Sequence, residues 1–429
     1  MTHLPYLPRT CVDLSRIRAN YRLLAERLGS IQFPEPLVAP DGARQKERAL
    51  PPFWQPLMPV VKADAYGHGR MPVALALREE GAVWFASGSV QEAILLRQDF
   101  EAHAVPREQA GIVSMLGLVE PGDASLCAIH DIVPMLYDKE QLRLLESEPS
   151  LARAPLPVAV KCNSGMSRLG FNEDEIQPLR ERLRRLPLWP VLAVSHLHSA
   201  DMEDGRAQAQ AQARVFARFL AALREDWPGL AASLGNSAGA LLADAVTPLI
   251  GAHVCRPGLA LYGYNPFYGT SLAPLGQGLS PAMSVHAPII STRMLAAGDG
   301  IGYCHAYFAP RDMPVGIIGA GYSDCYARSL SNKGMCCVAG VRAPIIGRVA
   351  MQMTAVDLSA VYENARTPSP PRTAWLLGGP YAQGVSPEEL AALWGTIPYE
   401  VLLLLGHNAK VYGPYPEQDP PRDDTVQGS

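Results

Sequence analysis

The first 275 residues alternate helix-like and strand-like segments, and this alternation limits the possible folds more than any other feature of the chain. Apolar residues at steps of three and four predict amphipathic helices, most clearly over residues 14–28 and 215–223. Short apolar runs that suit buried strands occupy residues 112–116, 158–160 and 191–194. Helices that alternate with buried strands predict an α/β fold with a parallel sheet, either a closed barrel or an open, doubly wound sheet.

Residues with reactive or charged side chains lie just after strand-like segments. They are Lys62, Lys161, His196, Ser237 and Arg256. In a parallel barrel, the carboxyl ends of the strands build the functional face. An open sheet gathers its ligand-binding groups near one switch point instead. The spread of these residues favours the barrel, but the pattern alone leaves the open sheet as an alternative.

The decapeptide VVKADAYGHG at residues 60–69 is the most informative short segment. Two valines lead directly into Lys62, and a small, Gly-rich stretch follows, as at the end of a buried strand. The chain has only six lysines among its 37 Lys and Arg residues, which leaves 37 − 6 = 31 arginines. A desolvated, neutral lysine can form a Schiff base, whereas arginine cannot. Lys62 is therefore a candidate for that chemistry, and the alternative is a lysine that snorkels to water.

Beyond residue 275 the pattern becomes β-rich, with Gly, Asn and Asp between the runs. Strands are expected over residues 285–295, 315–318, 335–349, 354–358 and 374–377. One helix start is marked by Ser386, by proline at the next position and by glutamate three residues after the serine. The sequence thus predicts a second, mainly β domain.

These patterns define the expected domain boundaries. The domain with the parallel sheet is expected over residues 10–275 and the mainly β domain over residues 276–412. Residues 33–59 contain seven prolines and interrupt the line from the first helix to the strand before Lys62. The Pro- and Asp-rich tail at residues 413–429 is expected to be disordered.

Composition excludes several classes of function. The net charge of −4 and the pI near 6.2 argue against a nucleic-acid or membrane-surface partner. The start of the chain lacks the pattern of a signal peptide, and no run of 18 apolar residues occurs. The eight cysteines show neither disulfide-framework nor metal-site spacing. We expect a cytoplasmic protein with free thiols and no bound metal.

Further motifs follow residues 60–69 in a fixed order along the chain. They occupy residues 161–171, 195–197, 236–238, 256–263, 302–303, 321–324, 346–349 and 395–400. Together these motifs resemble the alanine racemase family over roughly residues 10–412. The resemblance implies a (β/α)₈ barrel followed by a mainly β domain, with pyridoxal 5′-phosphate (PLP) as cofactor. Because the family connects the first helix to the strand before Lys62 by a much shorter segment, the resemblance also implies that residues 33–59 are a surface insertion. It also implies interconversion of L- and D-alanine for peptidoglycan synthesis by a homodimer with shared active sites.

The resemblance implies roles for individual residues in a two-base mechanism. Lys62 matches the PLP-binding lysine, which serves one face of the substrate, and Tyr303 matches a tyrosine from the partner subunit, which serves the other. His196 matches the histidine that links this tyrosine to Arg256. Arg256 matches the arginine that faces the pyridine nitrogen of PLP. A permanent cation there makes PLP a weaker electron sink, which limits side reactions.

The remaining implied positions bind the cofactor phosphate and the substrate. The phosphate positions are Tyr66, Ser237, Gly258, Leu259 and Tyr412. Arg168 matches an arginine that contacts the phenolic oxygen of PLP and the substrate carboxylate. Lys161 matches a lysine that is often carbamylated, and its carbamate would clamp Arg168. Tyr322 and Met351 match further substrate-binding positions.

Three departures from the family pattern bear on specificity. Gln352 and Asn163 each stand where the family commonly has aspartate, and Cys304 follows Tyr303 where glycine is common. Loss of a carboxylate near the substrate leaves a serine or broad-specificity racemase as the near alternative. A decarboxylase with the same layout would have glutamate in place of Arg256. A non-catalytic PLP-carrier barrel would lack both the β domain and Tyr303.

Overall fold

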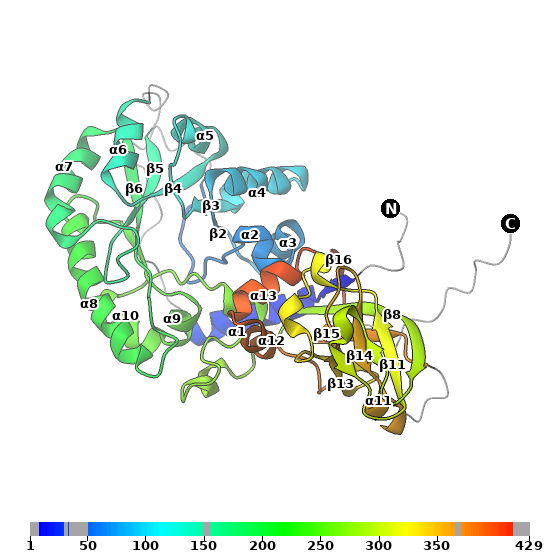
Figure 1. Cartoon of the computed structure of the whole chain (residues 1–429). Helices are drawn as coiled ribbons and strands as arrows, with labels where there is room; N and C mark the ends of the chain where they lie inside the picture. The colour runs from blue at the N-terminus through cyan, green and yellow to red at the C-terminus, as the bar shows by residue number, and fades with distance from the viewer. Residues whose placement is uncertain (1–7, 30–32, 34–49, 149–154, 365–369, 415–429) are drawn as a thin grey trace. The chain divides into compact units, whose positions relative to one another are not determined.

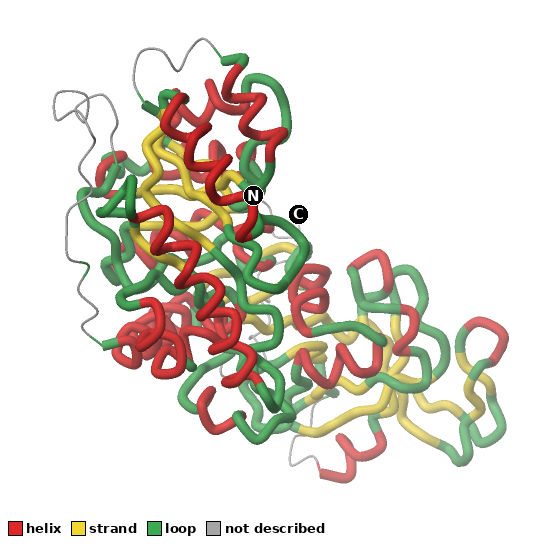
Figure 2. The backbone as a smooth tube through the Cα atoms, turned by 90° about the vertical axis from the view of Figure 1, so that its left-hand side faces the viewer, coloured by secondary structure: helices red, strands yellow, loops and turns green. Residues whose placement is uncertain are grey.

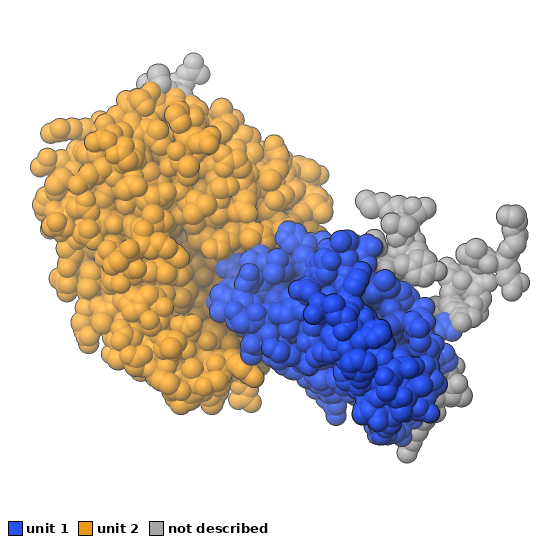
Figure 3. Space-filling model, in the orientation of Figure 1, with its two compact units in different colours: residues 1–15, 66–69, 281–429 blue, residues 16–65, 70–280 orange. Residues whose placement is uncertain are grey.

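The computed structural model describes residues 8–29, 33, 50–148, 155–364 and 370–414 of the chain. Helices predominate up to residue 280, and strands predominate after it (Figure 1). Figure 2 shows the helices in red and the strands in yellow. The chain divides into two compact units (Figure 3). We call residues 16–65 and 70–280 the barrel unit, and residues 1–15, 66–69 and 281–429 the β unit.

The barrel unit contains six parallel strands in sequence order. They are β2 (Trp84–Ser87), β3 (Gly111–Ser114), β4 (Ile132–Leu136), β5 (Leu156–Lys161), β6 (Leu188–Val194) and β7 (Ala231–Ser233). Every residue in these strands is buried, as expected for parallel strands that are covered on both faces.

Two further extended segments close the sheet into a barrel. Residues 56–61 reach β2 through the Val61 N–H, which donates to the Ala86 carbonyl at 2.9 Å. On their other side, the Met58 N–H donates to the Cys255 carbonyl at 2.8 Å. The segment around Cys255 in turn joins β7 through the Val254 N–H. This closure confirms the barrel, and it also shows that the predicted insertion at 33–59 ends before residue 56; residues 34–49 lie outside the described residues.

Helices connect the barrel strands. Their bounds are α1 (Leu14–Leu28), α2 (Lys62–Tyr66), α3 (Arg70–Glu79), α4 (Val90–Ala102), α5 (Asp123–His130), α6 (Lys139–Glu146), α7 (Ile176–Arg185), α8 (Gly205–Arg224), α9 (Ser237–Leu241) and α10 (Ala243–Ile250). The apolar stripe predicted over residues 14–28 is confirmed by α1, whose buried positions include Ile17, Tyr21 and Leu24.

The β unit contains an eight-stranded sheet in the order β11-β14-β13-β12-β15-β8-β1-β16. Its strands are β1 (Arg9–Val12), β8 (Met283–Leu295), β11 (Met313–Ile318), β12 (Met335–Val338), β13 (Val341–Ile346), β14 (Thr354–Asp357), β15 (Thr373–Leu377) and β16 (Ala409–Tyr412). The long strand β8 pairs with both β15 and β11, so six of the strands close on themselves.

Shorter elements complete the β unit. They are β9 (Gly300–Ile301), β10 (Tyr307–Phe308), α11 (Ser359–Asn364), α12 (Pro387–Trp394) and α13 (Pro398–Leu405). The helix start predicted at Ser386 is confirmed, because the Ser386 hydroxyl accepts the Glu389 N–H at 3.2 Å.

The N-terminal boundary differs from the expected barrel limit at residue 10. Strand β1 pairs in parallel with β16 and antiparallel with β8, so residues 9–12 belong to the β unit. These pairings satisfy backbone groups on both edges of β1, which explains why the strand lies there. Of the expected tail, residues 415–429 lie outside the described residues. No helix in the described part of the chain is long and apolar enough to cross a membrane.

Candidate active site

The barrel places five of the predicted site residues at the carboxyl ends of its strands. Lys62 follows the extended segment at residues 56–61, Lys161 ends β5, His196 lies two residues after β6, Ser237 begins α9 after β7, and Arg256 belongs to the extended segment around Cys255. Parallel strands in a barrel direct their carboxyl ends to one edge. The electrostatic couplings among these cationic residues, described below, are consistent with that common location.

The backbone after Lys62 forms a turn of left-handed helix. The φ/ψ angles are 50°/54° at Ala63, 53°/44° at Asp64 and 55°/50° at Ala65, and φ is 55° at Tyr66. Left-handed helix costs about 1–2 kcal/mol for each L-residue with a Cβ. The sequence predicted a Gly-rich turn here but gave no sign that four non-glycine residues would adopt this conformation.

Three hydrogen bonds within the barrel unit hold this turn. The Ala65 N–H donates to the Val61 carbonyl at 3.0 Å, and the Arg70 N–H donates to Asp64 Oδ1 at 2.8 Å. The Ala63 N–H donates to Glu92 Oε1 at 2.9 Å. Strained backbone persists where surrounding contacts over-determine it, and such places cluster at functional sites.

Arg256 is a buried cation that binds neutral groups. Its side chain donates from Nη1 to the Ser233 hydroxyl and from Nη2 to the Ser195 carbonyl at 2.6 Å. Nη2 also lies 3.4 Å from Nδ1 of His196. Burial lowers the pKa of Arg256 to about 10, so it stays protonated near neutral pH.

His196 is neutral at physiological pH. Burial and then the nearby cations, Arg256 foremost, lower its pKa to about 3. A guanidinium can only donate, so Nδ1 of His196 must be the acceptor in the contact with Arg256. We therefore assign the ring proton to Nε2, which leaves His196 with a donor on the side away from Arg256.

The two lysines of the site differ in exposure. Lys161 is 8% exposed, and burial followed by Arg256, Arg168 and Lys62 lowers its pKa to about 8. Lys62 is open to solvent, yet the surrounding protein and then Arg168 lower its pKa as well, with Glu92 acting in the opposite direction. A lowered pKa increases the neutral, nucleophilic fraction of an amine.

Ser237 joins the predicted phosphate-binding segments within the barrel unit. Its hydroxyl oxygen accepts the N–H groups of Gly258 and Ala260, both at 3.1 Å. Leu259 lies between them and begins a 3₁₀ turn. Hydroxyls and backbone N–H groups of this kind suit a phosphate group.

A buried hydrogen-bond network behind His196 was not predicted. The Ser195 hydroxyl donates to the Cys162 carbonyl at 2.9 Å and lies 2.7 Å from the Ser164 hydroxyl. Gln212 of α8 donates to the His196 carbonyl at 3.0 Å and accepts the His198 N–H at 2.9 Å. Gln212 lies in an Ala/Gln/Arg-rich run, and nothing local distinguishes it from Gln208 and Gln210, which precede it.

Asn163 shapes the loop that carries Arg168. Its Oδ1 accepts the N–H groups of Gly165 and Ser167, at 3.2 and 2.9 Å. An aspartate at this position could accept the same two bonds. The amide therefore preserves the loop contacts while it removes one negative charge.

Two predicted phosphate-binding tyrosines, Tyr66 and Tyr412, lie in the β unit, where Tyr66 is near Tyr399 and Tyr412 is near Gly69. The ring centroid of Tyr66 is 6.0 Å from that of Tyr399 in α13. Gly69 has a φ of 95°, and a Cβ there would overlap the Tyr412 hydroxyl. The close approach of Tyr412 to Gly69 explains the need for glycine at this position.

The other predicted residues of the β unit are exposed. Tyr303 is 70% exposed, Met351 58% and Tyr322 43%. Tyr322 and Met351 lie on adjacent segments, because the Tyr322 N–H donates to the Ala350 carbonyl at 3.1 Å. Cys304, next to Tyr303, adopts a φ of 57°, a conformation that glycine would adopt without strain.

Comparison with known proteins connects this site to one family. The family model described as alanine racemase, N-terminal domain, matches residues 43–266, and the model for the C-terminal domain matches residues 282–412. An alanine racemase of Nitratidesulfovibrio vulgaris (strain DSM 19637 / Miyazaki F) is 46% identical over 356 residues, which cover 83% of this chain and 91% of that protein. One of Lawsonia intracellularis is 41% identical over 398 residues, which cover 92% and 94%.

Solved structures agree with this relationship. Biosynthetic alanine racemase from Pseudomonas aeruginosa matches with a TM-score of 0.74 and 31% identity over 95% of this chain and 99% of that one. Alanine racemase from Bartonella henselae, solved with covalently bound pyridoxal phosphate, matches with a TM-score of 0.75 and 25% identity over 95% and 100%. The chain therefore belongs to the alanine racemase family.

Proposed function

We propose that this chain is a PLP-dependent racemase that interconverts L- and D-alanine. The observation that carries the proposal is the cationic cluster at the barrel edge, where Arg256 contacts His196 and where burial, followed by the neighbouring cations, lowers the pKa of both Lys62 and Lys161. Perturbed titratable groups gathered in this way are typical of active sites. The chain's place in the alanine racemase family selects the reaction.

The residues present suit PLP. Lys62 offers a solvent-accessible amine of lowered pKa for covalent attachment. Ser237, Gly258 and Leu259 are proposed to bind the phosphate, and the hydrogen bond from the Gly258 N–H to the Ser237 hydroxyl joins the two segments that carry them. Tyr66 and Tyr412 are further expected phosphate-binding residues. Bound PLP would delocalise the charge that develops as the α-proton leaves. Arg256 would face the pyridine nitrogen and keep it unprotonated, and Arg168 would hold the substrate carboxylate.

Proton transfer needs one acid/base group on each face of the substrate. We assign Lys62 to one face and Tyr303 of a partner subunit to the other. Nε2 of His196 would donate a hydrogen bond to this tyrosine and favour its anionic form. Exposure of Tyr303, Tyr322 and Met351 in the single chain supports their burial in a homodimer.

Subunit sharing can be tested by complementation. Mixing Lys62→Ala with Tyr303→Phe protein should restore part of the activity, because one site of each heterodimer would contain both intact residues. No recovery after verified subunit exchange would contradict the shared site.

Lys161 is proposed to carry a carbamate that clamps Arg168. Its pKa of about 8 leaves enough neutral amine to react with carbon dioxide near neutral pH. The negative carbamate would also relieve the positive charge around it. Mass spectrometry under native conditions, with and without bicarbonate, would detect the modification.

D-Alanine for peptidoglycan is the proposed product, made in the cytoplasm. Gln352 and Asn163 favour one alternative, a serine or broad-specificity racemase, because each replaces a carboxylate with an amide. The experiment is Cα deuterium exchange in D₂O with added PLP, run across a panel of L-amino acids. We expect fast exchange and D-isomer formation with alanine, while equal or faster exchange with serine would favour the alternative. No exchange with any amino acid by PLP-loaded protein would overturn racemisation.

A further inference from the structure

Glu92 connects three parts of the barrel unit. It lies in the first turn of α4, and its own N–H donates to the hydroxyl of Ser89, which caps the helix, at 3.1 Å. Its Oε1 accepts the Ala63 N–H at 2.9 Å, and its Oε2 accepts the Gly88 N–H at 3.0 Å. Both carboxylate oxygens therefore bind backbone outside α4.

Helix capping alone does not explain this arrangement. Residues 89–92 read Ser-Val-Gln-Glu, the pattern of a capping box, in which the glutamate returns to the N–H of the capping serine. Here the carboxylate instead reaches Gly88 and Ala63. The second contact lies at the residue that directly follows Lys62.

The contact with Ala63 acts on the backbone of Lys62. The Ala63 N–H belongs to the planar peptide unit that also contains the Lys62 carbonyl, so this bond sets the orientation of that unit. Ala63 is also the first residue of the left-handed turn. A Cβ at Gly88 would clash with Glu92 and lie 3.6 Å from the Lys62 Cβ, so Gly88 permits this close packing.

Glu92 also acts on the charge of Lys62. Burial lowers the pKa of Lys62, and so do the charges of Arg168 in the loop after β5 and of Arg256 in the extended segment after β7. Lys161 of β5 is a further cation that is coupled to Lys62. Glu92 opposes them and raises the pKa of Lys62. It is thus placed to balance part of the positive charge.

We propose that Glu92 is a positioning residue for Lys62: it holds the start of the left-handed turn and supplies the counter-charge for the lysine. This role rests on the proposed function, in which Lys62 binds PLP. It adds a residue from outside the motif at residues 60–69 to the machinery that presents the lysine.

Two substitutions separate the contributions of backbone and charge. Glu92→Gln removes the charge but keeps one oxygen acceptor, whereas Glu92→Asp keeps the charge on a side chain one methylene too short to span both N–H groups. The matched control is Glu175→Gln in the same unit. Glu175 also accepts a backbone N–H at a helix start, from Asn172 at 3.0 Å.

The first readout is independent of turnover. Lys62 in the cofactor-free protein is labelled with a trace amount of acetic anhydride at graded pH and quantified by peptide mass spectrometry. We expect the labelling midpoint of Lys62 to move to lower pH in Glu92→Gln, because the opposing carboxylate is gone. Glu92→Asp should stay nearer to wild type, and Glu175→Gln should match wild type.

The second readout is the rate of PLP release from the loaded protein. We expect release to be about two- to tenfold faster in Glu92→Asp, the equivalent of one lost hydrogen bond. Wild-type labelling in Glu92→Gln together with wild-type release in Glu92→Asp would reduce Glu92 to a helix cap and overturn the proposal. If Glu92→Gln does not fold, the release rate of Glu92→Asp decides alone.

Failure of the proposed function would be distinguishable. A wild-type protein that does not racemise any amino acid would contradict the reaction, whereas the labelling midpoint of Lys62 would still report the effect of Glu92. A racemising wild type with unchanged variants would contradict the role of Glu92 alone.

Discussion

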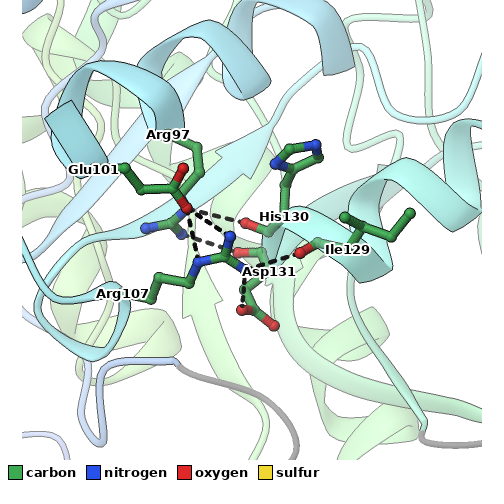
Figure 4. Close-up of polar contacts among 6 residues, drawn as sticks. All are labelled: Arg97, Glu101, Arg107, Ile129, His130 and Asp131. Atoms are coloured by element: carbon green, nitrogen blue, oxygen red, sulfur yellow. Dashed lines mark hydrogen bonds and ion pairs between the residues drawn. The ribbon is translucent and has the colours of Figure 1, made fainter.

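Arg97 and Arg256 are both buried in the barrel unit, and burial lowers the pKa of each to about 10, yet their surroundings differ. Arg97 of α4 lies near the start of β4, at the amino ends of the strands. It donates to the carbonyls of His130 and Asp131 at the end of α5, at 3.0 and 3.2 Å (Figure 4). Arg256, at the carboxyl ends, donates only to neutral groups among the contacts that the structure describes.

The neighbouring charges also differ between Arg97 and Arg256. Arg107 accompanies Arg97, donates to the Ile129 carbonyl at 2.8 Å and pairs with Asp131 and Glu101 (Figure 4). The last carbonyls of a helix carry partial negative charge, so the positive charges of Arg97 and Arg107 both lie beside negative or partly negative groups. The charges coupled to His196 beside Arg256 are all positive: Lys161, Arg168, Lys62 and Arg256 itself. One end of the barrel is neutralised, and the other retains positive charge that suits an anionic ligand.

The largest expected effect is at the charged end. Lys62→Ala should reduce racemisation by about 10³-fold or more, because it would remove both the proposed covalent attachment point for PLP and one of the two proposed proton-transfer groups. The measurement is the rate of D-alanine formation. Borohydride reduction of wild-type protein with PLP, followed by peptide mapping, should tag Lys62; a tag on Lys161 or Lys333 would contradict the assignment.

Arg256→Glu should weaken racemisation less, by about 10²-fold, because the contact with His196 is lost while Lys62 remains. Reversal of the charge should also favour protonation of the pyridine nitrogen and increase side reactions. The measurement is pyruvate formed per alanine racemised. Unchanged racemisation without extra pyruvate would remove Arg256 from this role.

Arg97→Met tests the neutralised end. We expect the free energy of unfolding to fall by about 2–3 kcal/mol, since the substitution leaves buried helix-end carbonyls without their donor. Racemisation per folded molecule should not change. Urea denaturation measures the first quantity, and Arg107→Met serves as the comparison, with a loss of about 1 kcal/mol because Arg107 is half-exposed. A loss of activity in folded Arg97→Met would contradict the separation of the two ends.

Lys161 should have the smallest effect, which is a pH dependence of the free energy of unfolding. Its pKa is about 8 in the folded chain against an ordinary value of 10.5. Between these values the unfolded chain binds more protons, so the free energy of unfolding rises with pH through this window. Lys161→Met removes the contribution. In bicarbonate-free buffer, the free energy of unfolding of wild type minus that of the variant should therefore increase from pH 8 to pH 10.5. A difference that does not change with pH would contradict the lowered pKa of Lys161.

Part of this comparison could be predicted from the sequence. Lys62, Lys161, His196 and Arg256 follow apolar runs, so their place at the carboxyl ends followed from strand direction. The cluster around Arg97 was not predicted. Arg97, Arg107 and Asp131 are separated by turns and helices, and local pattern does not say which carbonyl a distant arginine will reach.

The alternation of helices and apolar runs determined an α/β fold with a parallel sheet, and the family motifs selected the barrel and predicted which strand-end residues form the site. These features are local, because each depends on the spacing of residues within one element. Only the tertiary structure decided three features. Strand β1 pairs with β16, the Glu92 carboxylate accepts the Ala63 N–H instead of the N–H of the residue that caps its own helix, and the backbone after Lys62 is left-handed. Each of these depends on contacts between segments that are distant in sequence. Such contacts are selected by the hydrogen bonds and packing of the folded chain as a whole, which no local pattern records.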